Sequence, residues 1–189
     1  MDKRNETKKS VMAYFHDLTI FLAIILVVFM LLFRVVVVSG PSMMSTLLNG
    51  DYLIVLNQFF VGDPQPGDIV VISKSDYDNG TPIIKRVIAT EGQEVRIHNQ
   101  RVYVDGVLLN EPYIHGLPTT SPAGEDYRVI VEPGCVFVMG DNRVNSKDSR
   151  SNQIGQIDCR QIIGKAIFCI FPGADSSGKR DFGRLGGIG

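Results

Sequence analysis

The chain has 189 residues, of which 44% are hydrophobic and 21% are charged. This length suits one ordinary domain with an appendage, and the composition excludes wholesale disorder. The formal net charge is −1 and no basic stripe runs along the chain, which argues against nucleic acid as a partner.

The strongest feature of the N-terminal part is an apolar segment over residues 18–38, interrupted only by Arg34 near one end. Its 21 residues would extend roughly 31 Å as a helix, which matches the hydrocarbon core of a bilayer. We therefore expect one transmembrane helix over 18–38. The first ten residues carry four basic and two acidic side chains, so the positive-inside rule predicts that residues 1–17 lie in the cytoplasm. Everything after residue 38 is then extracytoplasmic, and the protein is a single-pass protein of the cell membrane.

Two other interpretations of this segment are weaker. A cleavable signal peptide would explain the small or modest residues at Val37, Val38 and Ser39, but its apolar run is usually only about 7–15 residues long. A core helix is disfavoured because no polar face interrupts the run. An uncleaved anchor is favoured on length.

Beyond the span the chain reads as short, β-branched segments bounded by turns, without a sustained helical period. We predict an all-β body of antiparallel sheets, partly barrel-like, over residues 39–175, with a small inserted excursion near 92–130. The Gly-rich end, 176–189, is predicted to be a flexible tail. The expected strands are 52–56, 68–72, 82–89, 94–98, 101–109, 127–131, 136–139 and 161–171.

The three cysteines, Cys135, Cys159 and Cys169, are too few and too scattered for a disulfide scaffold or a zinc site. Apolar neighbours favour an interpretation as small buried hydrophobic side chains. A Cys159–Cys169 bridge stays open for a domain outside the cytoplasm. Because metal-ligand spacings such as H-E-x-x-H are missing, no metal and no cofactor are expected.

The histidines offer little catalytic signal. His16, His98 and His115 have no nucleophile motif nearby, and G-x-S-x-G is absent. A triad built on histidine is therefore disfavoured.

Ser42 follows Gly40 and Pro41, which fix a tight, exposed backbone suited to presenting a hydroxyl. A serine that only caps a turn is nevertheless the commoner outcome after proline. Taken alone, Ser42 is a weak candidate.

Lys85 is more informative. Strand alternation places it with Ile83 and Val87 and places Arg86 on the opposite face, so one of the two cations must point toward an apolar side. Desolvation there lowers the pKa of an ammonium, and a neutral lysine amine can take the proton of a serine hydroxyl. The alternative is an edge-strand lysine that discourages aggregation.

A third cluster, residues 140–150, is dense in Asx, Ser and opposite charges. It fits either a surface loop or a polar network that holds a buried cation. Asp141 or Asp148 could pair with Arg86, which would otherwise be poorly solvated.

Together these segments resemble one family, the type I signal peptidases, which are membrane-bound serine proteases with a Ser/Lys dyad. The resemblance runs from residue 18 to about 172, in the family's order and behind a membrane span, which makes it specific. Its motifs are Ser39-Gly-Pro-Ser-Met-Met-Ser-Thr-Leu47, Asn49-Gly-Asp51, Pro66-Gly-Asp-Ile-Val-Val71, Lys85-Arg-Val87, the hairpin from Val102 to Tyr113, Gly140-Asp-Asn-Arg143 and Ser146-Lys-Asp-Ser-Arg150.

The resemblance implies that Ser42 is the nucleophile, Lys85 is the general base, and the Ser42 backbone N–H meets the oxyanion. The implied supporting roles are a hydrogen bond from Ser146 that orients the Lys85 amine, an ion pair between Asp141 and Arg86, a brace from Asp148 and Arg150, and packing of Met43 beneath the dyad.

Two departures from the family pattern matter. Gly40 stands where some relatives have a serine that supplies a second oxyanion donor, so that donor is left to water or backbone. Ser45 occupies a position where the family often has proline, and Val144 occupies one where the family often has an acidic residue. We expect these two changes to alter rigidity and not to abolish activity.

The resemblance also implies the partners. The substrates would be exported preproteins with small residues at −1 and −3 before the cut, bound as an extended strand, and the enzyme would work as a monomer in the bilayer. Two rival functions are a membrane-tethered β module that binds secretion partners without catalysis, and a self-cleaving Ser/Lys regulator related to DNA-damage repressors. The anchor argues against the second.

Overall fold

The computed structural model describes residues 3–74, 77, 80–121, 126–175 and 177–188, with side chains described from residue 12 onward. The chain divides into two units, residues 1–34 and residues 35–189, each described here by itself.

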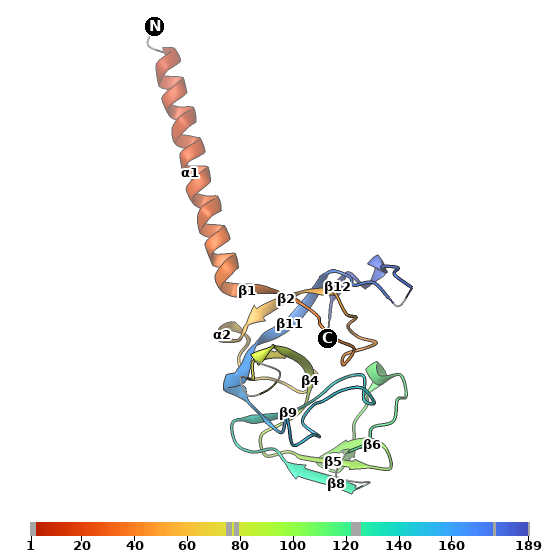
Figure 1. Ribbon diagram of the computed structural model, residues 1–189. Helices are drawn as coiled ribbons and strands as arrows, with labels where there is room; N and C mark the ends of the chain where they lie inside the picture. Colours follow the sequence, from red (N-terminus) through yellow and green to blue (C-terminus); the bar gives the residue numbers. More distant parts are fainter. Residues whose placement is uncertain (1–2, 75–76, 78–79, 122–125, 176, 189) are drawn as a thin grey trace. The chain divides into compact units, whose positions relative to one another are not determined.

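The first unit is one long helix, α1 (Lys3–Leu32) (Figure 1). Its stretch Met12–Leu32 has 21 residues with a mean hydropathy of 2.5 and none of it is buried, so it is long and apolar enough to cross a membrane. The helix differs in its bounds from the transmembrane helix predicted over 18–38. The helix begins earlier, and Phe33–Val37 form strand β1, because β-branched valines favour extended backbone and this strand pairs with the next one.

The body is built on a large, antiparallel sheet, as predicted for an all-β domain. Among the described residues its order is β1-β2-β11-β3-β4-β9-β10, with β12 also paired to β11. Its strands after β1 are β2 (Tyr52–Asn57), β3 (Ile69–Ile72), β4 (Ile83–Thr90), β9 (Cys135–Met139), β10 (Ile157–Asp158), β11 (Ile162–Phe171) and β12 (Gly186–Gly187); the short helix α2 (Gln58–Val61) follows β2.

Register shifts explain why this sheet curls into a partial barrel. They occur in β11 against both β2 and β3, and in β4 between Val87 and Ala89. An extra residue on one strand bends it and increases its twist, so the sheet cannot stay flat. The ten-residue β11 runs between β2 and β3 and joins the two halves of the sheet.

The excursion near 92–130 folds as a smaller sheet whose described strands run in the order β7-β6-β5-β8. These are β5 (Glu94–His98), β6 (Arg101–Val104), β7 (Val107–Leu108) and β8 (Asp126–Ile130). The Asp105-Gly106 turn, with positive φ at both residues, divides the single strand expected over 101–109 into β6 and β7. A 3₁₀ turn, η2 (Pro112–Ile114), follows β7.

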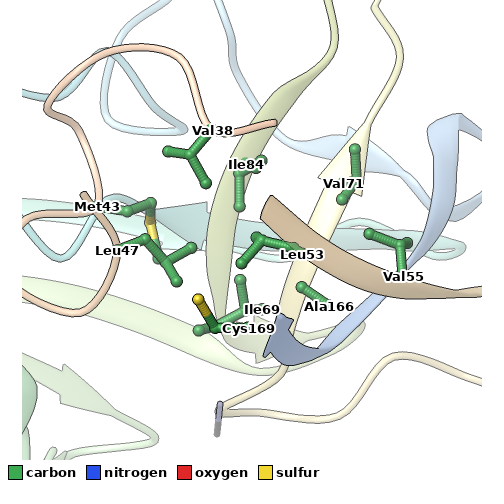
Figure 2. Packing of buried hydrophobic residues seen from close by; sticks show 10 residues of the cluster. All are labelled: Val38, Met43, Leu47, Leu53, Val55, Ile69, Val71, Ile84, Ala166 and Cys169. Atoms are coloured by element: carbon green, nitrogen blue, oxygen red, sulfur yellow. The ribbon is translucent and has the colours of Figure 1, made fainter. Parts of the chain in front are cut away.

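Among the described residues, three apolar clusters form the core. One lies between the two sheets and includes Val95, Ile97 and Phe137. Another packs the loop that follows β1 onto the large sheet, with Val38, Met43 and Leu47 against the strands (Figure 2). The position of this loop is therefore set by hydrophobic burial.

The cysteines are free thiols in different settings. Cys169 is buried as expected, whereas Cys135 and Cys159 are half-buried. The Cys159–Cys169 bridge that the sequence left open is not formed, since Cys169 belongs to the core around Met43 and Cys159 packs on a separate cluster. Burial raises the pKa of the Cys135 and Cys159 thiols.

The Gly-rich end differs from the flexible tail that its composition predicts. Phe182–Arg184 form a 3₁₀ turn, η4, and β12 pairs antiparallel with β11 through Phe168 and Cys169. The composition is misleading because a few specific contacts, described below, hold this segment.

Gly164 offers a test of the sheet's packing. A Cβ at this position of β11 would lie 2.3 Å from the Leu56 carbonyl oxygen and 2.7 Å from Val55 Cγ1. We expect Gly164→Ala to lower the free energy of unfolding by about 2 kcal/mol, because two strands must separate. Gly187→Ala, where the nearest atom would be 3.8 Å away, is the matched control in urea denaturation. Equal midpoints for the two variants would contradict this packing.

Candidate active site

Ser42 lies on the loop of residues 38–51, which backbone hydrogen bonds close at its base. Val38 N–H donates to Asp51 O and Gly50 N–H donates to Val38 O, each at 2.8 Å. Gly40 has a φ of +89°, a backbone conformation that is strained for residues with a side chain. Its N–H donates to Asn49 Oδ1 at 2.9 Å. These constraints hold the short segment that presents the Ser42 hydroxyl.

Lys85 reaches that hydroxyl from the middle of the large sheet. On β4 it pairs with Val70 of β3, and its neighbour Arg86 pairs with Met139 of β9, so the strand is held on both sides. Lys85 is only 4% exposed. Its Nζ donates to Ser42 Oγ at 2.8 Å and to the Ile84 carbonyl oxygen at 2.9 Å.

The surroundings of Lys85 favour its neutral form. Burial lowers the pKa of the amine from its ordinary value of 10.5 to about 8, and the negative charges of Asp148 and Asp141 oppose part of that shift. An appreciable fraction of the amine is therefore neutral near pH 7 and able to accept a proton. Strand alternation predicts that one of the two neighbouring cations, Lys85 or Arg86, points toward an apolar side, and the structure buries both.

Arg86 forms the predicted ion pair with Asp141. Its Nε and Nη2 donate to the two carboxylate oxygens at 2.9 and 2.8 Å, and Nη1 donates to Gly67 O at 2.8 Å. Thr46 Oγ1 donates to Asp141 Oδ2 at 2.5 Å. This buried, bidentate pair links the strand of Lys85 with the loop of Ser42.

Asp148 and Arg150 form a second buried pair, with Nε and Nη2 donating to the carboxylate at 2.8 Å each. Asp148 Oδ2 also accepts the Gly140 N–H at 3.0 Å, and Arg150 Nη1 donates to Thr120 O at 2.9 Å. The pair thus ties the segment after β9 to the excursion.

Gly140 brings this segment against the serine loop. A Cβ there would lie 2.4 Å from Ser42 O and 2.3 Å from Ser146 Oγ, so only glycine fits without displacing either group. The next residue but one, Asn142, donates its N–H to Ser42 O at 3.0 Å and its side-chain amide to Pro41 O at 3.1 Å.

Ser146 does not make the expected hydrogen bond to Lys85. Its Oγ is buried and has no hydrogen-bond partner among the described residues, while the Lys85 amine is engaged by Ser42 and Ile84. The hydroxyl packs instead against Gly140, where a Cβ would lie 2.3 Å from it.

Met43 and Gly40 complete the set of predicted residues. Met43 is 1% exposed and shares the core cluster of Val38, Leu47 and Ile84, the residue before Lys85 (Figure 2). Because the Gly40 N–H is engaged by Asn49, the Ser42 N–H is the candidate oxyanion donor on this loop.

The sequence does not reveal the contacts that the excursion makes with Arg143 and Arg86. Arg143, only 2% exposed, donates to Gly140 O at 3.0 Å and to Thr119 Oγ1 at 2.9 Å, and forms an ion pair with Glu111. The Tyr113 ring stacks on Arg86, 4.1 Å from the guanidinium carbon to the ring centre. The sequence signal that could have pointed to Glu111 and Tyr113 is their place at the end of the hairpin from Val102 to Tyr113, which resembles the family.

Comparison with known proteins places this chain in a family. Residues 11–171 match the model of the family described as signal peptidase, peptidase S26. The chain is 43% identical over 143 residues, 71% of its length and 69% of the relative, to a probable signal peptidase I-1 of Synechocystis sp.. It is 32% identical over 181 residues, 90% of its length and 94% of the relative, to a signal peptidase I of Bacillus licheniformis. A solved signal peptidase I from Enterococcus faecalis V583 aligns with 56% of this chain and 97% of that one at 27% identity, with a TM-score of 0.46.

The family model and the two sequence relatives define the chain as a peptidase. It belongs to the signal peptidase family, peptidase S26. In the part of the chain that the structure describes, one helix, near the N-terminus, is apolar and long enough to span a bilayer, and together with this membership it fits a single-pass membrane protein.

The buried amine makes a prediction about stability. Because folding lowers the pKa of Lys85 to about 8, the unfolded chain binds its proton more tightly, and this contribution to stability is unfavourable below that pH and relieved as the pH rises toward 10.5. Lys85→Met should therefore raise the free energy of unfolding at pH 7 by about 2 kcal/mol, and the gain should shrink between about pH 8 and 10.5.

Urea denaturation across that pH range measures the difference, with the exposed Lys147→Met as control. A Lys85→Met variant that is less stable than the wild type at pH 7, or whose difference does not vary with pH, would contradict the burial of a strained cation.

Proposed function

We propose that this chain is a membrane-anchored serine endopeptidase that removes N-terminal signal peptides from exported preproteins, with Ser42 as nucleophile and Lys85 as general base. One observation carries the proposal: a buried lysine amine lies 2.8 Å from a serine hydroxyl in a chain of the signal peptidase family. Nucleophile and base within hydrogen-bond reach are what covalent catalysis by serine requires.

The acylation step follows from the geometry. Neutral Lys85 Nζ takes the proton of Ser42 Oγ while this oxygen attacks the carbonyl carbon of the scissile peptide bond. The negative charge moves to the carbonyl oxygen, where the Ser42 N–H donates a hydrogen bond. The carbon–nitrogen bond then breaks, and the Lys85 ammonium returns its proton to the departing amine. The products are a free mature N-terminus and a signal peptide joined to Ser42 as an ester.

Deacylation reverses the roles. A water molecule gives a proton to Lys85 and attacks the ester carbon, and the carbon–oxygen bond to Ser42 breaks. Ser42 recovers a proton from Lys85, and the signal peptide leaves with a free carboxylate. Each proton passes through one amine, so the cycle needs no histidine.

The supporting residues hold this geometry. The Arg86–Asp141 pair fixes the strand of Lys85 to the serine loop through Thr46, and the Asp148–Arg150 pair fixes the Gly140 segment. Met43 fills the core beneath the loop. Breaking a buried pair by removing one partner costs about 3–5 kcal/mol, so these residues act through structure.

The substrates follow from the proposed compartment. Four basic residues among the first ten support a cytoplasmic segment 1–17, with the catalytic body of residues 39–175 outside the cytoplasm, where exported chains emerge. The enzyme would work as a monomer on preproteins with small residues at −1 and −3, bound in extended form along a strand edge.

Loss of either dyad residue should abolish cleavage. Ser42→Ala and Lys85→Ala each remove one partner of the 2.8 Å contact, and we expect kcat/KM to fall by more than about 10³-fold. The assay uses a detergent-solubilised full chain and a precursor ending in Ala-x-Ala, with the new N-terminus determined by mass spectrometry.

Ser45→Ala, on the same loop, is the matched control and should retain activity. A folded Ser42→Ala or Lys85→Ala variant that still cleaves at the wild-type rate would refute the dyad, and a wild type that binds precursors without cutting them would favour a non-catalytic module.

The activity should rise with pH. Because the base must be neutral and burial sets its pKa near 8, kcat/KM for a peptide without titratable side chains should increase about tenfold per pH unit below pH 7 and level off above about pH 8.5. A flat profile between pH 6 and 9, or one that falls with rising pH, would exclude Lys85 as the base.

A further inference from the structure

The C-terminal segment of residues 177–188 lies beyond the part of the chain that matches the family model, which ends at residue 171. It is nevertheless attached to the body. β12 pairs with β11, and Ile188 donates its N–H to Ile167 O at 3.1 Å. The Ile188 side chain packs against the core cluster that contains Met43 and Leu47.

Arg184 joins this segment to the serine loop. Its Nη1 donates to Asp51 Oδ1 at 3.0 Å, and its Nη2 donates to Asp51 Oδ2 at 2.7 Å and to Thr46 O at 3.1 Å. Both acceptors belong to the loop of residues 38–51, on the C-terminal side of Ser42. A planar guanidinium matches a carboxylate in this bidentate way, and a lysine would not.

Asp51 is a buried charge that depends on these donors. It is 0% exposed, and its oxygens also accept the N–H groups of Leu48 at 2.8 Å and Gly173 at 2.6 Å. A buried carboxylate is tolerated only when it is paired and hydrogen-bonded. The positive charge that pairs with the Asp51 carboxylate is that of Arg184, in the tail.

The contacts continue from Arg184 to the dyad. Thr46 is held at its carbonyl oxygen by Arg184 and at its hydroxyl by Asp141, which in turn pairs with Arg86, the neighbour of Lys85. The serine loop is thus fixed from two sides, by the sheet through Asp141 and by the tail through Arg184.

We propose that Arg184 is a positioning residue for the nucleophile: it clamps the loop of residues 38–51 so that Ser42 stays within reach of Lys85. This inference rests on the proposed function. Because the clamp touches the loop and not the dyad, its loss should slow the chemical step and change the affinity for substrate little. A displacement near 1 Å can cost a factor of about 100 in rate.

The test compares Arg184→Ala, Arg184→Lys and a chain ending at Arg180 with the wild type, each with its N-terminal helix intact and in detergent. Lys179→Ala is the matched control, because it removes a positive charge from an exposed side chain of the same segment. We expect kcat to fall at least about tenfold in Arg184→Ala and in the shortened chain, with KM within about twofold, and partial retention in Arg184→Lys. Lys179→Ala should behave as the wild type.

Rescue separates positioning from a general loss of structure. The Arg184 side chain is 21% exposed, so a small cation can enter the space that the alanine variant leaves. Methylguanidinium at millimolar concentration should restore kcat in Arg184→Ala and leave Lys179→Ala unchanged. The same concentration of methylammonium should restore less, because it lacks the forked donors.

Hydrogen exchange provides a reading that does not depend on activity. Amides of residues 38–51 should exchange faster in Arg184→Ala, while those of β4 and β9 stay as in the wild type. Wild-type kcat in Arg184→Ala with unchanged exchange would overturn the inference and leave the proposed function standing. Faster exchange throughout the body, without rescue, would overturn it in favour of a purely structural role. A wild-type protein that cuts no precursor would instead refute the proposed function, and the exchange of the loop would still decide whether the clamp exists.

Discussion

The structure depends on keeping one lysine amine away from water while a serine hydroxyl stays 2.8 Å from it. Burial of this kind is unfavourable for a cation, and it lowers the pKa of Lys85 to about 8. The same environment that destabilises the ammonium makes the amine a base near neutral pH. Burial of Lys85 therefore lowers the free energy of unfolding while it makes the amine reactive, and the packing of the surrounding sheet must compensate for this loss of stability.

The rest of the site is arranged around that requirement. Lys85 stands on a strand paired on both sides, so its backbone cannot shift, whereas Ser42 stands on a loop that has to be held. Three devices hold it: burial of Met43 and Leu47 in the core, the contact of the loop with the Gly140 segment, and the Thr46 bridge to the Arg86–Asp141 pair. The two buried ion pairs also place Asp141 and Asp148 near the amine, where they limit how far its pKa falls. The tail adds a fourth contact, through Arg184, from beyond residues 11–171, the part of the chain that matches the family model.

Much of this could be predicted from the sequence, for physical reasons. β-branched runs bounded by Gly, Pro and Asn gave the long strands, and the length of the apolar segment gave the N-terminal helix, although its valines ended it sooner than hydropathy indicates. Lys85 and Arg86 stood out because alternation forces one cation toward an apolar face. What failed were interactions between distant parts of the chain: the Arg143–Glu111 pair, the stacking of Tyr113 on Arg86 and the clamp from Arg184 have no local pattern. A hydrogen bond was expected for Ser146, yet sequence cannot tell that its hydroxyl packs against Gly140 instead.

The central claim concerns the ionisation of a single nitrogen, and it can be measured directly. Lysine labelled with ¹³C at the ε carbon gives one NMR resonance per side chain, and the signal of Lys85 is assigned by its absence in Lys85→Met. The structure requires that this resonance titrate near pH 8, well below 10.5, the ordinary pKa of a lysine side chain. If the Lys85 signal instead titrates near 10.5, the ordinary value, the amine is solvated in the folded protein and cannot serve as the base of this site.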